Sequence, residues 1–70
     1  MAAEIEIQVN DKPRRVPDTT TLAQLIDHMG VNAATVVAEV SGAIIAPARF
    51  AVTTLRAGDR VELVRFVGGG

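Results

Sequence analysis

The group in this chain most open to chemical activation is the α-carboxylate of Gly70, which follows Gly68 and Gly69. Three consecutive glycines have no side chain to pack and little preference for a fixed backbone. Fully extended, they reach about 10 Å at ~3.3–3.6 Å each, so they can thread a narrow channel of a partner enzyme. A carboxylate is a poor electrophile. We therefore expect it to react only after an ATP-using partner converts it to an acyl-phosphate-type mixed anhydride.

No set of side chains in the sequence suggests catalysis. His28 is the single histidine and falls near the end of a predicted helix, where a solvent-side position is favoured by the helix dipole. Asp27 and Asp59 belong to separate predicted elements, so nothing in the sequence supports a catalytic pair of these two carboxylates. The run Thr19-Thr20-Thr21 is typical of a helix entry. The glycine spacing lacks a phosphate-binding loop, and without cysteine there is no thiol nucleophile or zinc cluster. We predict a protein that is not an enzyme and binds no metal or cofactor itself.

Composition limits the other classes of function. Seventy residues, 49% of them apolar, suffice for one small core without disulfides. A net charge of −1 with no basic patch argues against nucleic-acid binding. No apolar run approaches the ~20 residues of a membrane span, and the N-terminus lacks the features of a signal peptide. The expectation is a cytoplasmic protein that binds no membrane.

The first half of the chain predicts a hairpin followed by a helix. Residues 4–9 alternate polar and apolar, as a half-buried strand does, and residues 14–16 can return as a second strand. Apolar residues in the stretch 22–29 recur at helical spacing. Thr21 and Gln24 fit a capping box before this helix, and Gly30 fits its left-handed C-terminal cap.

The second half predicts three further strands, at residues 36–40, 43–46 and 60–67, with one short helical turn at 47–51 that anchors Phe50 in the core. One amphipathic helix can cover one face of a four- or five-stranded mixed sheet, which is an α+β arrangement. A single-domain β-grasp fold over residues 1–67, with the first and last strands adjacent and parallel, is the economical solution. Residues 68–70 would then form a separate tail.

The last strand carries apolar residues where polar ones are expected. With period two, Val61 and Leu63 face the core, which leaves Glu62, Val64 and Phe66 on the solvent side. Exposed large apolar groups usually mark an interaction site. We therefore predict that Val64 and Phe66 form a docking patch that guides the glycine tail into a partner.

The C-terminal block, residues 58–70, reads GDRVELVRFVGGG and combines a Gly-Asp turn, a strand and a terminal glycine run. With this block, the Thr21-Leu22 helix entry and the hairpin sequence EVSG at 39–42, the chain resembles the ThiS family over nearly its whole length. These are the ubiquitin-like sulfur carriers of bacterial thiazole synthesis. One departure is Ala48-Arg49-Phe50, where many relatives carry Trp or Tyr, and this affects packing more than function.

The resemblance implies a β-grasp carrier whose C-terminus is modified by other proteins. An E1-like adenylyltransferase of the ThiF type would use ATP-Mg to adenylylate Gly70, and a sulfurtransferase route would convert it to a thiocarboxylate. Thiazole synthase of the ThiG type would then take the sulfur for thiamine biosynthesis. By analogy the residues that thread the partner's active site are Gly68, Gly69 and Gly70, and those that border the partner surface are Val64, Phe66 and Val67.

Four alternatives stay open at this point. The small subunit of molybdopterin synthase shares the fold and the thiocarboxylate chemistry, but it is usually longer and carries a residue other than Gly before its terminal pair. Carriers of other sulfur pathways have the same design. A ubiquitin-like modifier joined to lysines of other proteins belongs to a different class, and so does a purely structural interaction module that never uses its carboxylate.

Overall fold

The computed structural model describes residues 3–66 of the 70-residue chain. The strands are β1 (Glu4–Val9), β2 (Lys12–Pro17), β3 (Val36–Val40), β4 (Ala43–Ile45) and β5 (Arg60–Arg65), and the helices are α1 (Leu22–His28) and the 3-10 helices η1 (Ala33–Thr35) and η2 (Pro47–Val52). Within these residues no helix is long and apolar enough to cross a membrane.

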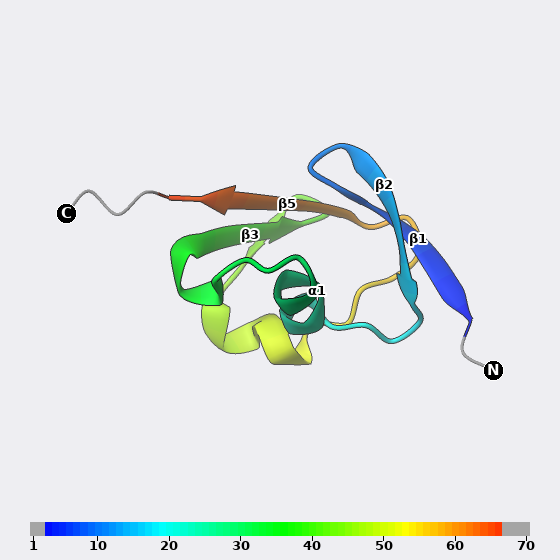
Figure 1. The fold of residues 1–70 in the computed structure, drawn as a ribbon, viewed down its shortest axis with the longest axis horizontal. Helices are drawn as coiled ribbons and strands as arrows, with labels where there is room; N and C mark the ends of the chain where they lie inside the picture. The colour runs from blue at the N-terminus through cyan, green and yellow to red at the C-terminus, as the bar shows by residue number, and fades with distance from the viewer. Residues whose placement is uncertain (1–2, 67–70) are drawn as a thin grey trace.

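The five strands form one mixed sheet in the order β2-β1-β5-β3-β4 (Figure 1). β1 and β5 pair in parallel, with Gln8 opposite Arg60 and Val9 opposite Val61, and all other neighbours are antiparallel. The first strand of the chain and the last therefore lie side by side in the middle of the sheet. This confirms the predicted β-grasp topology.

The turn between β1 and β2 also fastens β1 to β5. Asn10 and Asp11 have φ values of 51° and 67°, which is the pattern of a two-residue type I′ hairpin. The Asn10 side-chain oxygen accepts a hydrogen bond from the backbone N–H of Leu63 at 2.9 Å, and its amide nitrogen donates to the Leu63 carbonyl at 3.4 Å. Its own backbone N–H donates to the carbonyl of Val61 at 2.9 Å. Asn10 thus continues the β1–β5 ladder beyond the end of β1.

Replacement of Asn10 by Ala should lower the free energy of unfolding by about 1–3 kcal/mol, because the N–H of Leu63 loses its acceptor. Alanine is also strained at positive φ, where asparagine is tolerated. Urea denaturation of both proteins measures the loss. Asn10→Gly removes the same hydrogen bonds without the strain, so the difference between wild type and Asn10→Gly measures the side-chain bonds and the difference between the two variants measures the strain. Equal urea midpoints for wild type and both variants would contradict this role.

The helix α1 has the ends that its sequence predicts. The Thr21 hydroxyl accepts from the backbone N–H of Gln24 at 3.2 Å, and the Gln24 side chain accepts from the N–H of Thr21 at 2.9 Å, which is the predicted capping box. Gly30 has φ +70° and donates its N–H to the Asp27 carbonyl. The N–H of Val31 completes a Schellman motif at the C-terminus.

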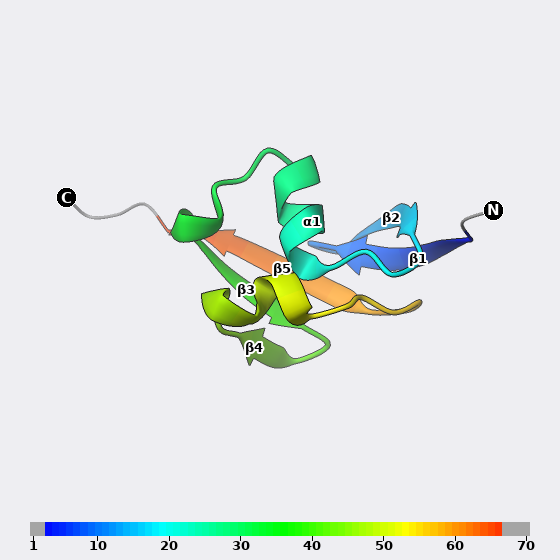
Figure 2. The same ribbon diagram turned by 90° about the horizontal axis from the view of Figure 1, so that it is seen from below.

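The core lies between the sheet and its two covering helices. Figure 2 shows α1 and η2 over the same face of the sheet. Phe50, from η2, is only 4% exposed, as predicted. η2 spans six residues, more than the single turn expected, because Pro47 begins a run that stays 3-10 helical to Val52. The other buried apolar residues are Ile7, Val9, Val16, Leu22, Leu25, Ile26, Val36, Ala38, Leu55, Val61 and Leu63. No helix within residues 3–66 covers the opposite, open face of the sheet (Figures 1 and 2).

Candidate partner-docking surface

Strand β5 presents opposite properties on its two faces. Val61 and Leu63 are buried against the core, whereas Glu62 is exposed and Val64 is 60% exposed. The period-two prediction for these four residues is therefore confirmed. Because β5 is the central strand, Val64 lies on the open face of the sheet and is not hidden at an edge.

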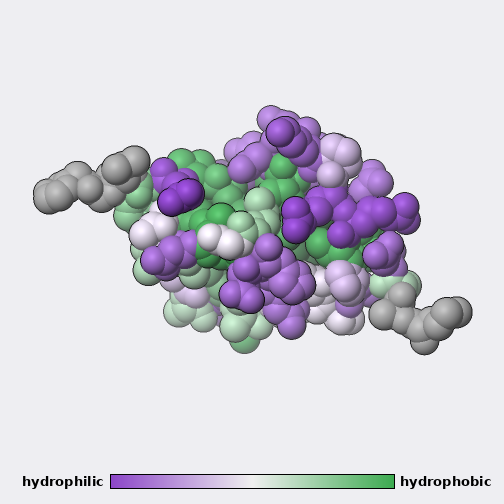
Figure 3. Space-filling model, viewed as in Figure 1, coloured by the Kyte–Doolittle hydropathy of each residue, from purple (hydrophilic) through white to green (hydrophobic). Residues whose placement is uncertain are grey.

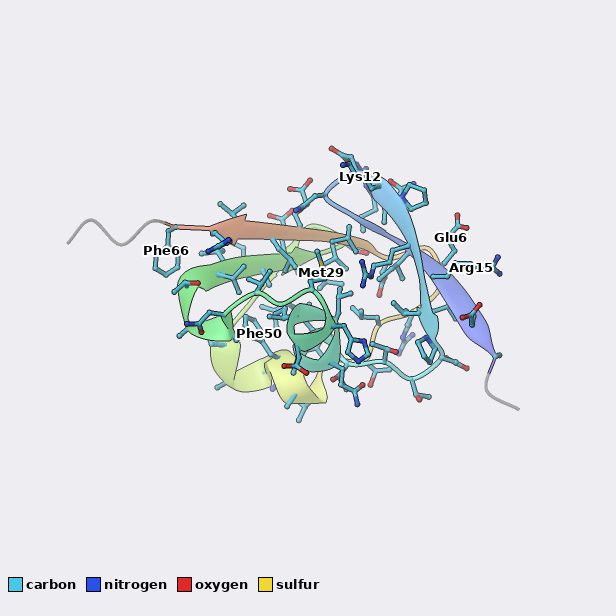
Figure 4. All side chains as sticks on the ribbon, viewed as in Figure 1. Glu6, Lys12, Arg15, Met29, Phe50 and Phe66 are labelled. Carbon is cyan, nitrogen blue, oxygen red and sulfur yellow. The ribbon has the colours of Figure 1, made fainter. Side chains whose placement is uncertain are left out.

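Phe66 follows the end of β5 and is exposed, as predicted, at 51%. Its backbone N–H donates to the carbonyl of Thr35 at 3.1 Å, which holds it beside η1. In Figure 4 its ring lies below the end of β5, on the side of the strand where α1 also lies in this view. The alternation predicts that this ring shares a face with Val64, and that prediction is wrong, so the two residues do not form the single patch expected from the sequence. The ladder of β5 with β3 ends at Arg65 opposite Val36, so nothing enforces the alternation one residue further on.

The predicted residues Val67, Gly68, Gly69 and Gly70 lie outside the described residues. β5 runs toward the end of the molecule that is opposite the β1–β2 hairpin (Figure 1). Phe66, the last described residue, lies at that end, beside the segment that enters β3.

Two further apolar residues share the open face with Val64. Val37, 43% exposed, lies directly opposite Val64 on β3, and Ile44, 72% exposed, lies on β4 opposite Glu39. Figure 3 shows apolar residues reaching the surface between polar side chains toward the end of the molecule where β5 terminates. Neither Val37 nor Ile44 was predicted to lie at a surface. For Val37 the signal was the period of two along a strand, because its neighbours Val36 and Ala38 are both buried and Val37 must then point outward.

Beside these apolar residues is a polar hollow of about 430 Å³, lined by Glu39, Ser41, Gly42, Gly58, Arg60 and Glu62. The Asp59 side chain stabilises the turn that borders this hollow. Its carboxylate accepts from the backbone N–H of Arg56 at 2.8 Å and from the Ser41 hydroxyl at 3.0 Å. Arg60 is paired with Asp11 at 3.3 Å. The predicted turn role of Asp59 is thereby confirmed.

The remaining titratable candidates form no site. His28 and Asp27 are exposed on α1, while the Asp59 carboxylate is used by its own turn. Among residues 3–66 no group of three or more His, Asp or Glu side chains is arranged to hold a metal ion. Thr20 and Thr21 serve the helix entry, where the Thr20 hydroxyl donates to the Pro17 carbonyl and Thr21 is the N-cap.

A five-stranded mixed sheet covered by one α-helix, with parallel first and last strands at its centre, defines a β-grasp protein of the ubiquitin-like class. The sequence model of the ThiS family matches residues 2–70, and the chain belongs to this family.

Solved structures agree with this assignment. The crystal structure of the thiamine biosynthesis protein ThiS from Geobacter metallireducens is 32% identical, with a TM-score of 0.82 over 94% of this chain and 100% of that one. A solution NMR structure of a thiamine biosynthesis protein from the same organism is also 32% identical, with a TM-score of 0.75 over 94% of this chain and 88% of that one. A further relative, the uncharacterized protein ycf40 of Porphyra purpurea, is 27% identical over 66 residues, which are 94% of this chain and 93% of its own length.

Proposed function

We propose that this chain is a sulfur carrier of thiazole synthesis and that Gly70 carries the sulfur. The observation that supports it most is the ThiS-family match, which extends through residue 70 and so includes the glycine run. Two exposed apolar residues precede that run, Val64 on the open face and Phe66 on the side of α1, and we assign both to contacts with the partner. In this proposal Val67 and the glycines are held by the partner, and the carrier itself is neither an enzyme nor the holder of a cofactor.

In the proposed chemistry the Gly70 carboxylate is first adenylylated and then converted to a thiocarboxylate. A carboxylate oxygen attacks the α-phosphorus of ATP bound with Mg²⁺ in a ThiF-type activating enzyme, and pyrophosphate leaves. The resulting acyl-adenylate is a good electrophile. Sulfur at the oxidation level of sulfide, delivered through a sulfurtransferase, then attacks the acyl carbon, and AMP leaves with the electron pair of the C–O bond, which gives a thiocarboxylate. A ThiG-type thiazole synthase is the proposed acceptor of that sulfur.

Mass spectrometry of the intact protein tests this proposal. The purified chain is incubated with an E1-like activating enzyme from the same cell, ATP-Mg and a sulfur donor. We expect a species heavier by an adenylyl group, then one in which sulfur replaces a single oxygen at Gly70. An unchanged mass beside an enzyme that activates its usual carrier would refute the proposal. Covalent ladders on other proteins would instead indicate a protein modifier.

Replacement of Phe66 by Asp should leave the domain folded and weaken the complex with the activating enzyme. The ring is half exposed, so the fold loses little, whereas loss of an interface anchor costs more than about 1 kcal/mol, which raises Kd at least about fivefold. Isothermal titration measures the Kd, and circular dichroism checks the fold. Val52→Asp is the matched control, since Val52 is 65% exposed but lies on η2. Equal affinities of the two variants would exclude Phe66 from the interface.

A further inference from the structure

We propose that the free edge of β4 pairs in antiparallel fashion with the β4 edge of a second copy of this chain, about a two-fold axis that passes beside Ile44. Two five-stranded sheets would then join into one continuous sheet. β2 and β4 are the two outer strands, and Figure 2 shows β4 along one margin of the sheet. The inference goes beyond the proposed function and does not depend on it, because it involves neither the Gly70 carboxylate nor Val64 or Phe66.

The hydrogen bonds of β3 determine which way the backbone of β4 faces. The Ser41 N–H donates to the Arg60 carbonyl at 2.7 Å, and the Phe66 N–H donates to the Thr35 carbonyl at 3.1 Å. In an antiparallel ladder the hydrogen-bonded and non-hydrogen-bonded pairs alternate. The odd-numbered residues of the stretch 35–41 therefore bond to β5, and its even-numbered residues bond to β4.

Ile44 is the residue of β4 whose backbone groups point away from the sheet. It lies opposite Glu39, whose backbone bonds to β5, so Ile44 and Glu39 form a non-hydrogen-bonded pair. Both the N–H and the carbonyl of Ile44 are therefore directed toward the free edge. None of the turn, loop and cap hydrogen bonds within residues 3–66 uses either group, and Ile44 is 72% exposed. The edge thus offers one donor and one acceptor from the same residue.

The outer edge of β2 is closed to the same kind of pairing. The Asp18 N–H donates to the Ala3 carbonyl at 2.7 Å, so by the same alternation the backbones of Pro13, Arg15 and Pro17 face outward. The two prolines have no N–H, and the residue between them is charged. Prolines and charged residues on an edge strand prevent further strands from adding to it. The sheet can therefore extend at β4 and not at β2.

A second copy of the chain matches the β4 edge because the outward residue can pair with itself. When two β4 strands run antiparallel with Ile44 opposite Ile44, the N–H of each copy donates to the carbonyl of the other. Such an isologous contact closes a dimer. Residues 43–46 carry no charge and the net charge of the chain is only −1, so repulsion between copies is small. The two Ile44 side chains then pack as a cross-strand pair.

The length of β4 favours this occupant over a long strand of another protein. β4 begins directly after the turn at Ser41 and Gly42, and beyond its end the Ala46 carbonyl is already the acceptor of the Arg49 N–H at 2.8 Å. A longer strand would gain few further backbone bonds along this edge. Two copies of β4 are equal in length, so their edges match.

Analytical ultracentrifugation of the purified full-length chain, from low micromolar to millimolar concentration, tests the inference. The contact is small beside the roughly 1,200 Å² of a stable interface, so we expect a dimer with a Kd on the order of 0.1–1 mM. Ile44→Pro removes the outward N–H at a position where an edge strand tolerates proline, and Ile44→Val keeps it. Ile44→Lys keeps the N–H but places two ammonium groups side by side. Val64→Lys is its matched control, with the same charge on the open face of the central strand.

We expect Ile44→Pro and Ile44→Lys to raise the dimer Kd at least about tenfold, because the first loses two backbone hydrogen bonds and the second opposes like charges. Ile44→Val and Val64→Lys should dimerise as the wild type does. Circular dichroism checks each fold, and if Ile44→Pro is unfolded, Ile44→Lys decides alone. A wild-type chain that stays monomeric at millimolar concentration overturns the inference. A dimer that survives both Ile44 variants, or is lost in Val64→Lys, overturns it as well. The proposed function stands or falls separately, on the mass of the activated chain.

Discussion

Removal of Gly69 and Gly70 should abolish adenylylation while leaving the thermal unfolding of the domain unchanged. The core and the sheet are built from residues 3–66, and the buried apolar residues extend only to Leu63. The shortened chain keeps a terminal carboxylate, now on Gly68. The deletion moves that carboxylate back by about 7 Å at ~3.3–3.6 Å per residue, which takes it out of reach of ATP in the partner. Intact-protein mass after incubation with the activating enzyme and ATP-Mg measures the loss.

Gly70→Ala is the finer variant of the same experiment, since it keeps the length and the carboxylate but adds a Cβ. We expect normal folding and slower adenylylation, because a channel shaped for glycine has no space for a methyl group. Normal adenylylation of Gly70→Ala would show that the channel does not select against a side chain. Normal adenylylation of the shortened chain would remove the case for a sulfur carrier, and would favour an interaction module.

Replacement of Phe50 by Ala should cost about 3–5 kcal/mol of unfolding free energy. Phe50 is the aromatic residue of the core and is 4% exposed, so its removal leaves a cavity between η2 and α1. A domain of this size has a total stability of about 0.05–0.15 kcal/mol per residue, and the variant should lose a large part of it. At roughly 4–8 °C per kcal/mol, the thermal midpoint should fall by at least about 12 °C.

The second phenylalanine of the chain is the natural control. Phe66→Ala removes the same atoms from a half-exposed position, so we expect a change within about 0.5 kcal/mol, as for most surface substitutions. Differential scanning calorimetry on the two variants compares one chemical change in two environments. Equal losses of stability would mean that Phe66 packs into the fold far more than its exposure indicates, and would weaken its assignment to a docking role.

Local sequence signals predicted those parts of the fold that depend on neighbouring residues. The Thr21 and Gln24 pair and Gly30 define the ends of α1 by hydrogen bonds that span only a few positions. The alternation of Val61, Glu62, Leu63 and Val64 assigned the two faces of β5, since one of them had to cover the core. These signals sufficed for the β-grasp topology and for the exposure of part of the candidate site.

Features that depend on strand register were not predictable in the same way. Asn10 reads as an ordinary turn residue, and its bonds to Leu63, 53 residues away, exist only once β1 and β5 are paired. The opposition of Glu39 to Glu62 is likewise a product of register, because a shift by one residue would separate them. The direction of the Phe66 ring was missed because the alternation stops with the ladder at Arg65.

The central place of β5 has a consequence for synthesis on the ribosome. The strand made last fills the gap between β1 and β3, and Val61 and Leu63 complete the core from there. A nascent or truncated chain that stops before β5 has two half-sheets with no partner between them, so it should remain open to proteolysis. We therefore expect that chains which accumulate in the folded state have been translated at least through β5, which ends a few residues before the glycine run.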